Sequence, residues 1–210
     1  MSSVGIIGAG KLGTALARAA VEAGFEVTLT SRDVESTRLI AEVMAPGTRV
    51  GTLAEAASAD LVVLALPLLR LRDLPAEVFA GKDIVDAINW WEPVDGPIDR
   101  YEVGMAQTSE LVRKHLPGAK VVKSLNQLGY HDIEDGRRPQ GAPDRLGVAV
   151  AGDDASAVQI VAGFVDILGF DPVVAGTLKE GQSLGPGGPA FGVAMTAEEL
   201  KQALFSAAKR

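Results

Sequence analysis

The sequence predicts an α/β protein with a doubly wound, mostly parallel sheet and a C-terminal strand and helix extension. An apolar run at residues 4–7 is followed by Gly8, Gly10 and Gly13, which have the G-x-G-x-x-G spacing. Strand-like and helix-like apolar patterns then alternate along the chain, as in parallel sheets with crossover helices. No internal repeat or linker-like stretch interrupts residues 1–210. We therefore expect a single domain with the Rossmann dinucleotide-binding fold.

Composition limits the classes of function. Hydrophobic residues make up 47% of the chain and charged residues 22%, which is typical of a globular protein. The net charge of −7 argues against nucleic acid or an anionic membrane as the main partner. The chain has no cysteine, so disulfides and thiolate sites are excluded, and we expect no metal. The first strand begins close to Met1 and no long apolar run occurs, so we expect a cytoplasmic protein.

Each glycine of the first turn has a separate task. Gly8 permits the tight turn, Gly10 leaves the backbone bare where a pyrophosphate approaches, and Gly13 lets the helix pack closely on the strand. The helix N-terminus then offers free N–H groups to the phosphates. A glycine-rich turn in an ordinary α/β protein is the alternative. The predicted cofactor-binding residues here are Gly8, Ala9, Gly10, Lys11, Leu12 and Gly13.

The second strand, at residues 27–30, ends in a sequence that favours NADP over NAD. An NAD site usually has an acidic residue here for the ribose 2′-hydroxyl, whereas this chain has Ser31 and Arg32. A hydroxyl and a guanidinium suit a 2′-phosphate. Asp33 follows directly and weakens the case, and a solvated loop arginine is the alternative for Arg32. Arg38, on the next helix, is a second candidate for the same phosphate.

The remaining elements follow from periodicity and turn residues. The run at residues 60–66 is continuously apolar, as in a strand covered on both faces, and Pro67 ends it. Leu66 and Pro67 should border the nicotinamide, because ligands lie beyond the carboxyl ends of parallel strands. We expect further strands near residue 50 and at residues 83–89, 120–126, 146–151 and 172–175, and helices at residues 12–23, 34–45, 52–59, 74–79, 109–115, 155–168 and from 196 onward, the last with a Thr196–Glu199 capping box.

Polar and aromatic residues at the later strand ends are candidates for substrate binding. Asn89 should lie by the cofactor, and Trp90 or Trp91 could wall a flat substrate or divide between core and surface. Asn126 can donate and accept toward a carboxamide or a ring carbonyl. Lys123 is unusual within an apolar strand, and a sheet edge explains it better than a place in the site.

Two loop segments have open interpretations. His131 is a candidate substrate-binding residue in a segment predicted as a loop, although a solvated loop histidine is commoner than a catalytic one. Arg137 and Arg138 either hold an anionic substrate tail or are exposed. Residues 181–192 contain five glycines and two prolines, which is too broken for a core element. They form a lid or a flexible surface connection.

The chain resembles a known family, the NADPH-dependent reductases of the deazaflavin coenzyme F420. The likeness begins with the glycine turn followed by Ser31 and Arg32. It continues at residues 65–67, 86–89, 116–126, 150–154 and 168–172, over nearly the whole chain. The tryptophans after Asn89 depart from the family pattern. The resemblance implies NADPH as cofactor, coenzyme F420 as substrate and a homodimer.

We therefore expect an oxidoreductase that transfers hydride between NADPH and a flat acceptor, with coenzyme F420 as the acceptor that the resemblance implies. Hydride transfer requires donor and acceptor to be held close in a dry site, so it does not need an acid–base pair. A flavin, quinone or imine reductase remains open, because fold does not determine function. A non-catalytic NADP-binding sensor is the competing class.

Overall fold

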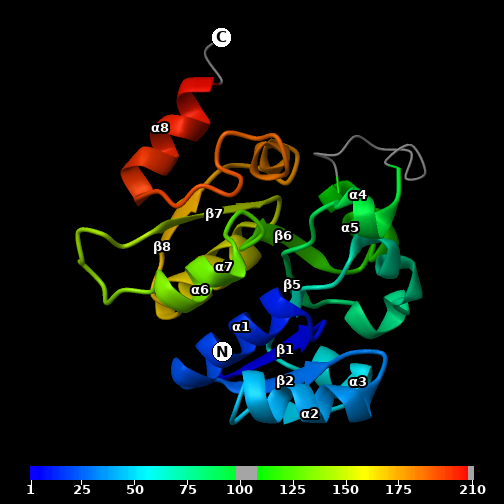
Figure 1. The fold of residues 1–210 in the computed structure, drawn as a ribbon. Helices are drawn as coiled ribbons and strands as arrows, with labels where there is room; N and C mark the ends of the chain where they lie inside the picture. The colour runs from blue at the N-terminus through cyan, green and yellow to red at the C-terminus, as the bar shows by residue number, and fades with distance from the viewer. Residues whose placement is uncertain (98–107, 208–210) are drawn as a thin grey trace.

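The computed structural model describes residues 1–97 and 108–207 (Figure 1). The strands are β1 (Ser3–Ile7), β2 (Glu26–Thr30), β3 (Arg49–Val50), β4 (Leu61–Leu64), β5 (Asp83–Asp86), β6 (Lys120–Ser124), β7 (Gly147–Gly152) and β8 (Asp171–Val174). The α-helices are α1 (Lys11–Glu22), α2 (Val34–Met44), α3 (Leu53–Ala57), α4 (Glu92–Asp95), α5 (Thr108–His115), α6 (Tyr130–Asp135), α7 (Ala155–Ile167) and α8 (Ala197–Ala207). Short 3-10 helices are η1 (Leu68–Asp73), η2 (Ala76–Phe79) and η5 (Glu180–Leu184).

The described strands form one sheet in the order β3-β2-β1-β4-β5-β6-β7-β8. The pairs from β3 to β6 are parallel, the β6–β7 pair is antiparallel, and β7–β8 is parallel again. The first six strands have the order of a dinucleotide-binding fold. The chain adds β2 and β3 on one side of β1, and then adds β4, β5 and β6 on its other side. The predicted fold class, a doubly wound and mostly parallel sheet with a C-terminal extension, is confirmed.

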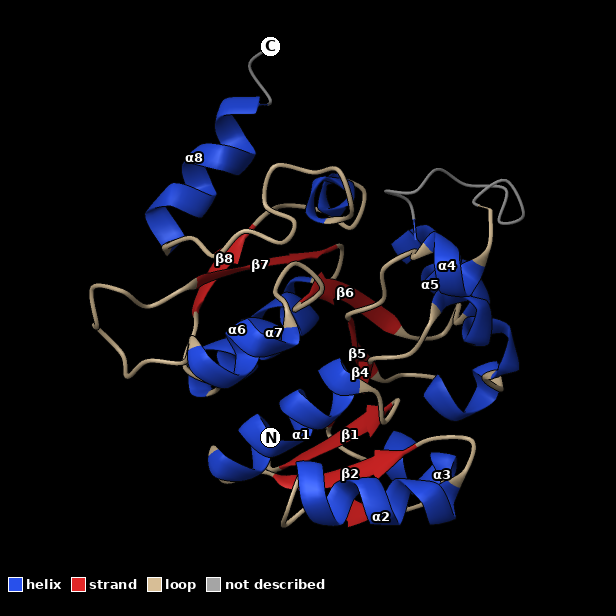
Figure 2. Ribbon diagram, viewed as in Figure 1, coloured by secondary structure: helices blue, strands red, loops and turns tan. Residues whose placement is uncertain are grey.

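Helices cover both faces of the sheet (Figure 2). One core joins α1, α2 and α7 to one face, with Leu16 of α1 and Phe164 of α7 fully buried in it. A second core on the other face joins α3, η1, η2 and α5 to the middle strands, around Phe79. A third lies between α8 and the strands β7 and β8, where Leu200 and Leu204 are buried. Strands β1, β4 and β7 consist almost entirely of apolar residues and glycine, because both of their faces are covered.

Side-chain caps set several helix starts. The predicted capping box of α8 is present, since Thr196 N donates to Glu199 Oε2 at 2.8 Å and Glu199 N donates to Thr196 Oγ1 at 3.4 Å. Asp154 caps α7 by accepting from Ala157 N at 2.9 Å. These bonds satisfy N–H groups that a helix N-terminus otherwise leaves unpaired.

The interpretation of Lys123 as a sheet-edge residue is wrong. Strand β6 lies inside the sheet, between β5 and β7, and the Lys123 side chain is 2% exposed. The ammonium is tolerated there because Asp86 stands beside it on β5. The opposing carboxylate lies far away in the sequence, so the apolar pattern of the strand gave no sign of it.

The segment at residues 181–192 is part of the core, which also corrects the sequence interpretation. Leu184 and Ala190 are fully buried in the third core. Asn126 Nδ2 donates to the Leu184 carbonyl at 2.8 Å, and Gly192 N donates to the Gln127 carbonyl at 2.9 Å. The glycines and prolines thus allow the backbone of this segment to pack closely against the residues that follow β6.

Smaller differences concern the loops. The predicted helix at residues 74–79 is the 3-10 helix η2, and η1 precedes it without having been predicted. The predicted loop at residues 92–106 begins with α4, and its part from residue 98 onward lies outside the described residues. The loop around His131 contains α6. Among residues 1–97 and 108–207, none of the helices has both the length and the apolar character that a membrane crossing requires.

Candidate functional site: a dinucleotide cleft

The three glycines of the first turn are placed for their separate tasks. Gly8 has a φ of +121°, and a Cβ there would stand 2.1 Å from the Ala65 carbonyl oxygen. A Cβ at Gly13 would stand 1.8 Å from the Gly8 carbonyl oxygen, so α1 packs directly on the turn. A Cβ at Gly10 would meet nothing within 4 Å. The backbone at Gly10 is therefore open to a ligand, while Gly8 and Gly13 are required by the fold.

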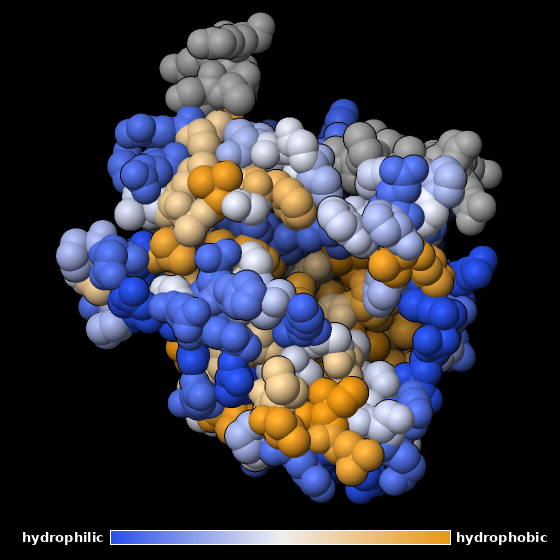
Figure 3. Space-filling model, viewed as in Figure 1, coloured by the Kyte–Doolittle hydropathy of each residue, from blue (hydrophilic) through white to orange (hydrophobic). Residues whose placement is uncertain are grey.

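A cleft of about 640 Å³ opens beside this turn, at the carboxyl ends of β1, β2 and β4. Its position at the reversal of strand order is where such sheets bind dinucleotides. Of the residues that sequence reasoning proposed, those that line the cleft are Gly8, Ala9, Gly10, Ser31, Arg32, Leu66 and Pro67. The space-filling view shows the hollowed middle of this face with apolar walls (Figure 3).

Lys11, Leu12 and Gly13 do not line the cleft. Lys11 begins α1, and its Nζ donates to the Tyr130 hydroxyl at 3.3 Å and lies 5.0 Å from the centre of that ring. Leu12 packs on the core, and Gly13 makes the close contact described above. Sequence reasoning missed Tyr130, because nothing in the pattern of α6 indicates a partner on α1. The contact with Tyr130 holds the ammonium of Lys11 near the glycine turn.

The residues after β2 favour a 2′-phosphate more clearly than the sequence did. The Asp33 carboxylate caps α2, accepting from Ser36 N at 3.0 Å and Ser36 Oγ at 2.6 Å. These bonds, the Ser36 hydroxyl first, hold the pKa of Asp33 below its usual value. Asp33 also lines the cleft, but its carboxylate is engaged with α2, whereas Arg32 is exposed there and has no ion-pair partner among the described residues.

Arg70 lines the cleft, whereas the predicted Arg38 does not. Arg38 lies on the exposed surface of α2, 3.4 Å from Glu35 Oε1, and does not line the cleft. Arg70 of η1 does line it and pairs with Asp73 at 3.3 Å. Sequence reasoning missed Arg70, because it did not predict η1 and had no reason to place a residue beyond Pro67 at the cleft.

Apolar residues give the cleft a wall suited to a flat ring. Ile40 of α2 and Leu53 of α3 line the cleft near Ser31 and Arg32. The buried Thr37 accepts or donates a 2.7 Å hydrogen bond with Ser31 Oγ, which fixes that hydroxyl at the cleft edge. Ligand sites of this kind combine apolar walls with a few placed polar groups.

Asn89 and Asn126 are hydrogen-bonded to one another just beyond the carboxyl ends of β5 and β6. Asn89 Nδ2 donates to the Asn126 carbonyl at 2.7 Å, and Asn126 Nδ2 donates to Asn89 Oδ1 at 3.0 Å. With its bond to Leu184, both hydrogens of the Asn126 amide are used, and its buried Oδ1 has no partner in the structure. Asn126 can therefore only accept, which narrows the role that its sequence suggested.

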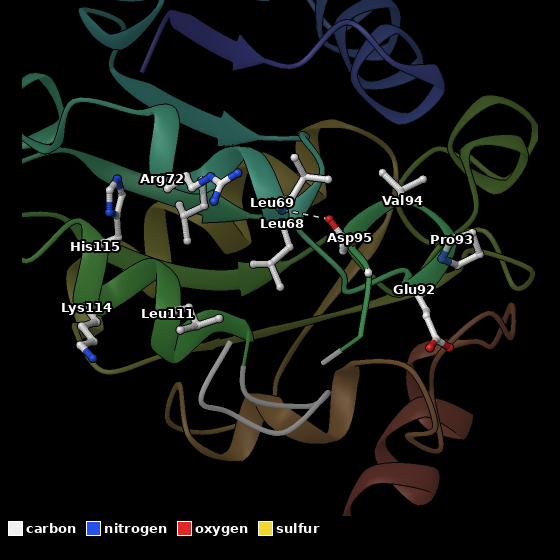
Figure 4. Close-up of a pocket in the computed structure, with 12 residues that line it drawn as sticks. Leu68, Leu69, Arg72, Glu92, Pro93, Val94, Asp95, Leu111, Lys114 and His115 are labelled. Atoms are coloured by element: carbon white, nitrogen blue, oxygen red, sulfur yellow. Dashed lines mark hydrogen bonds between the residues drawn. The ribbon is translucent and has the colours of Figure 1, made fainter. Parts of the chain in front are cut away.

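The two tryptophans divide between core and surface. Trp90 is partly buried against the second core, and its Nε1 donates to the Gly96 carbonyl at 2.9 Å. Trp91 is 63% exposed. Trp91 N donates to Asp95 Oδ2 at 2.7 Å, and Leu69 N donates to Asp95 Oδ1 at 2.9 Å, so α4 is tied to η1. Figure 4 shows this tie within a second hollow of about 710 Å³, with Arg72, Lys114 and His115 around its other end.

His131 and the paired arginines contact other residues and do not line the cleft. His131 is exposed on α6, with its ring centre 3.8 Å from that of Tyr130, the residue that Lys11 contacts. Arg137 pairs with Glu22, at the opposite end of α1 from the glycine turn. Arg138 pairs with Asp144 at 2.7 Å. Neither arginine is free to hold an anionic substrate tail in this structure.

The residues present fit a dinucleotide phosphate. The open space above Gly10, the N-terminus of α1 and the unpaired Arg32 meet the requirements of a pyrophosphate and a 2′-phosphate. Leu66, Pro67 and Asn89 continue the same edge toward β5, where the other half of a dinucleotide would extend.

The chain is similar in sequence and in fold to several known proteins. Residues 3–90 match the family described as NADP oxidoreductase coenzyme F420-dependent. The structure of SMa0349, a protein of Sinorhizobium meliloti described as hypothetical, is 28% identical with a TM-score of 0.81, covering 93% of this chain and 96% of that one. A protein of Arthrobacter sp. FB24, described provisionally as an F420-dependent NADP-reductase, is also 28% identical, with a TM-score of 0.71 and 87% of each chain covered.

A curated relative belongs to the same enzyme class. A glycerol-3-phosphate dehydrogenase [NAD(P)+] of Desulfitobacterium hafniense is 26% identical, over 81% of this chain and 58% of that protein. The chain spans about half the length of the curated relatives it matches, 43% of one and 58% of the other. The family and the relatives named by activity are described as NAD(P)-dependent oxidoreductases, the class that the sequence predicts for this chain. The predicted resemblance to the family NADP oxidoreductase coenzyme F420-dependent is thus confirmed by the match at residues 3–90 and by the Arthrobacter neighbour.

Proposed function

We propose that the protein exchanges hydride between NADPH and a flat acceptor, which is the deazaflavin coenzyme F420. The observation that carries the nucleotide part is the cleft edge after β2. Arg32 is unpaired there among the described residues, while the Asp33 carboxylate is engaged as the cap of α2. The family match at residues 3–90 and the Arthrobacter neighbour support the acceptor.

Each part of the cleft has a distinct task in this proposal. The N–H groups at the start of α1 and the bare Gly10 bind the pyrophosphate, and Arg32 with Ser31 binds the 2′-phosphate. Leu66, Pro67 and Asn89 border the nicotinamide, which supplies the hydride. Trp90, Asn126 and His131 remain the proposed substrate-side residues, with Asn126 acting as a hydrogen-bond acceptor. No side chain needs to carry a proton between donor and acceptor carbons during hydride transfer.

Turnover with three acceptors tests the proposal. Purified protein with NADPH should reduce the deazaflavin coenzyme, followed by loss of deazaflavin absorbance, and should run in reverse with NADP. Flavin mononucleotide and a quinone serve as rival acceptors in the same assay. Turnover of a rival without the deazaflavin would reject the proposed acceptor. NADPH binding without turnover of any of them would favour a sensor.

Two further expectations belong to the proposal. The cytoplasm is the proposed location, where NADPH would be at hand. A homodimer is the proposed assembly, and the exposed apolar side chains Leu39 and Val43 on α2, 69% and 77% exposed, support an interaction surface.

A further inference from the structure

A buried ion pair lies beneath the strand ends on the nicotinamide side. Asp86 and Lys123 are directly opposite one another in the β5–β6 register, and their side chains are 0% and 2% exposed. Lys123 Nζ lies 3.3 Å from Asp86 Oδ2. Burial lowers the pKa of Lys123, and the neighbouring Asp86 opposes that shift. Well-packed apolar residues often replace such a pair without loss of stability, so its role is to be sought in what it holds.

The pair holds both backbone polar groups of Ile88. Lys123 Nζ donates to the Ile88 carbonyl, and Ile88 N donates to Asp86 Oδ1 at 3.0 Å. Ile88 is 1% exposed, so water cannot satisfy these groups instead. The peptide that leads directly into Asn89 is therefore held by charges from two neighbouring strands.

Two other elements enclose the pair. Ser109 Oγ, in the first turn of α5, donates to Asp86 Oδ2 at 2.6 Å. Gly181 covers Lys123 from the other side, since a Cβ at Gly181 would stand 3.4 Å from Lys123 Cβ and 3.0 Å from Ala151 Cβ. Close packing and four polar contacts leave the pair little freedom to rearrange.

The held peptide continues into the link between Asn89 and Asn126. Leu125, which precedes Asn126, has a φ of +61°, in the left-handed region that a leucine rarely adopts. Such backbone strain persists only where the surroundings impose it. Here the bonds of Asn126 to Asn89 and to Leu184 impose the conformation.

We infer that the Asp86–Lys123 pair is a positioning device for Ile88 and Asn89, and that it sets how the nicotinamide half of NADP(H) is held. The adenosine half binds after β2, and β5 lies three strands away across the sheet, roughly 14 Å at the usual strand spacing. The pair should therefore act on one half of the dinucleotide and not on the other. The inference rests on the proposed function, which places the nicotinamide at these strand ends.

The test compares two ligands that share the adenosine half. In the double variant Lys123→Met/Asp86→Asn, neither side chain is charged, and the Ile88 carbonyl loses the hydrogen bond from Lys123 Nζ. The variant should bind 2′,5′-ADP, which lacks nicotinamide, within twofold of the wild type. It should bind NADPH about tenfold more weakly, and the fluorescence of the bound nicotinamide should move toward that of free NADPH. In turnover, kcat should fall more than KM rises.

Arg145→Met is the matched control. Arg145 is also a buried cation, 3% exposed and paired with Asp166 and Asp171 on the α7–β8 side of the molecule. Its loss should lower the melting temperature and leave the ratio of the two affinities unchanged. If the double variant does not fold, Ser109→Ala removes one contact of Asp86 and leaves the pair; the ratio should then shift in the same direction, about threefold.

An unchanged ratio, or a parallel loss of both ligands, would show that the pair serves the fold alone and would overturn the inference. Ligand titration requires no acceptor. Absence of turnover in the wild type would therefore count against the proposed function, while the affinity ratio would still decide the role of the pair.

Discussion

Arg32 and Arg38 are both exposed arginines near the start of α2, and the structure gives them different tasks. Arg32 lines the cleft without an ion-pair partner among the described residues, whereas Arg38 faces Glu35 outside it. We expect the wild type to bind NADPH at least tenfold tighter than NADH, about 1.4 kcal/mol. Arg32→Ala should remove most of that preference with little change for NADH, and Arg38→Ala should keep it. Titration at one fixed salt concentration measures both; equal affinities in the wild type would contradict the assignment.

Gly10 permits a test of the phosphate site that spares the fold. A side chain there has free space, so Gly10→Val should stay folded while its branched side chain occupies the place of the pyrophosphate. We expect NADPH binding to be lost. Gly163→Val is the control, because Gly163 lies in α7 and a Cβ there also meets nothing within 4 Å. Circular dichroism checks the fold, and normal NADPH binding by a folded Gly10→Val protein would place the phosphates elsewhere.

At the scale of elements, the Asp60 carboxylate forms hydrogen bonds with the backbone at the start of the first strand. Asp60 Oδ2 accepts from Ser2 N at 2.7 Å and from Ser3 N at 3.1 Å, which lowers the pKa of Asp60 to about 2. A lowered carboxylate pKa contributes stability that is present above the ordinary value near 3.8 and is lost as pH falls toward 2. The free energy of unfolding, measured with urea, should therefore fall as the pH is lowered over this range. Asp60→Asn should reduce the slope of that pH dependence; an unaltered slope would rule Asp60 out as its source.

The sequence predicted element types well and element ends less well. Strand β4 was predicted over residues 60–66 but ends at Leu64; Ala65 N still donates to the Ile7 carbonyl at 2.9 Å, and Leu66 lines the cleft. Periodicity cannot separate these two uses of an apolar residue. The glycine turn was predictable, because the spacing of its glycines indicates where the backbone needs a positive φ or a close contact that a side chain would prevent.

Long-range polar partners could not be predicted. Lys123 and Asp86, or Lys11 and Tyr130, meet only after the sheet and helices assemble. A single sequence contains the residues but not their pairing. The 181–192 segment was misjudged for a related reason: glycine and proline there follow the surface of β6 and β7, and composition alone cannot distinguish that from a loop.

At the scale of the whole molecule, the exposed apolar face of α2 gives the homodimer proposal a testable form. Figure 3 shows apolar side chains gathered at the lower part of the molecule, where α2 lies. Light scattering on the wild type should give twice 21.8 kDa. Leu39→Lys/Val43→Lys should give a monomer of unchanged fold, because burying two ammonium groups at an interface is costly. A monomeric wild type would contradict the dimer, and a dimeric double variant would move the interface away from α2.

The antiparallel pair β6–β7 separates two parts of the sheet, which come from successive stretches of the chain. Strands β1 to β6 form a parallel nucleotide unit, and β7, α7 and β8 form a separate βαβ unit that runs the opposite way. Among the contacts of the second unit with the strand ends is the hydrogen bond from Asn126 Nδ2 to the Leu184 carbonyl of η5. Under the proposed function, in which the acceptor lies beside Asn126, variation in residues 147–192 would reshape the acceptor site and leave the glycine turn unchanged. One nucleotide unit could then be combined with different acceptors.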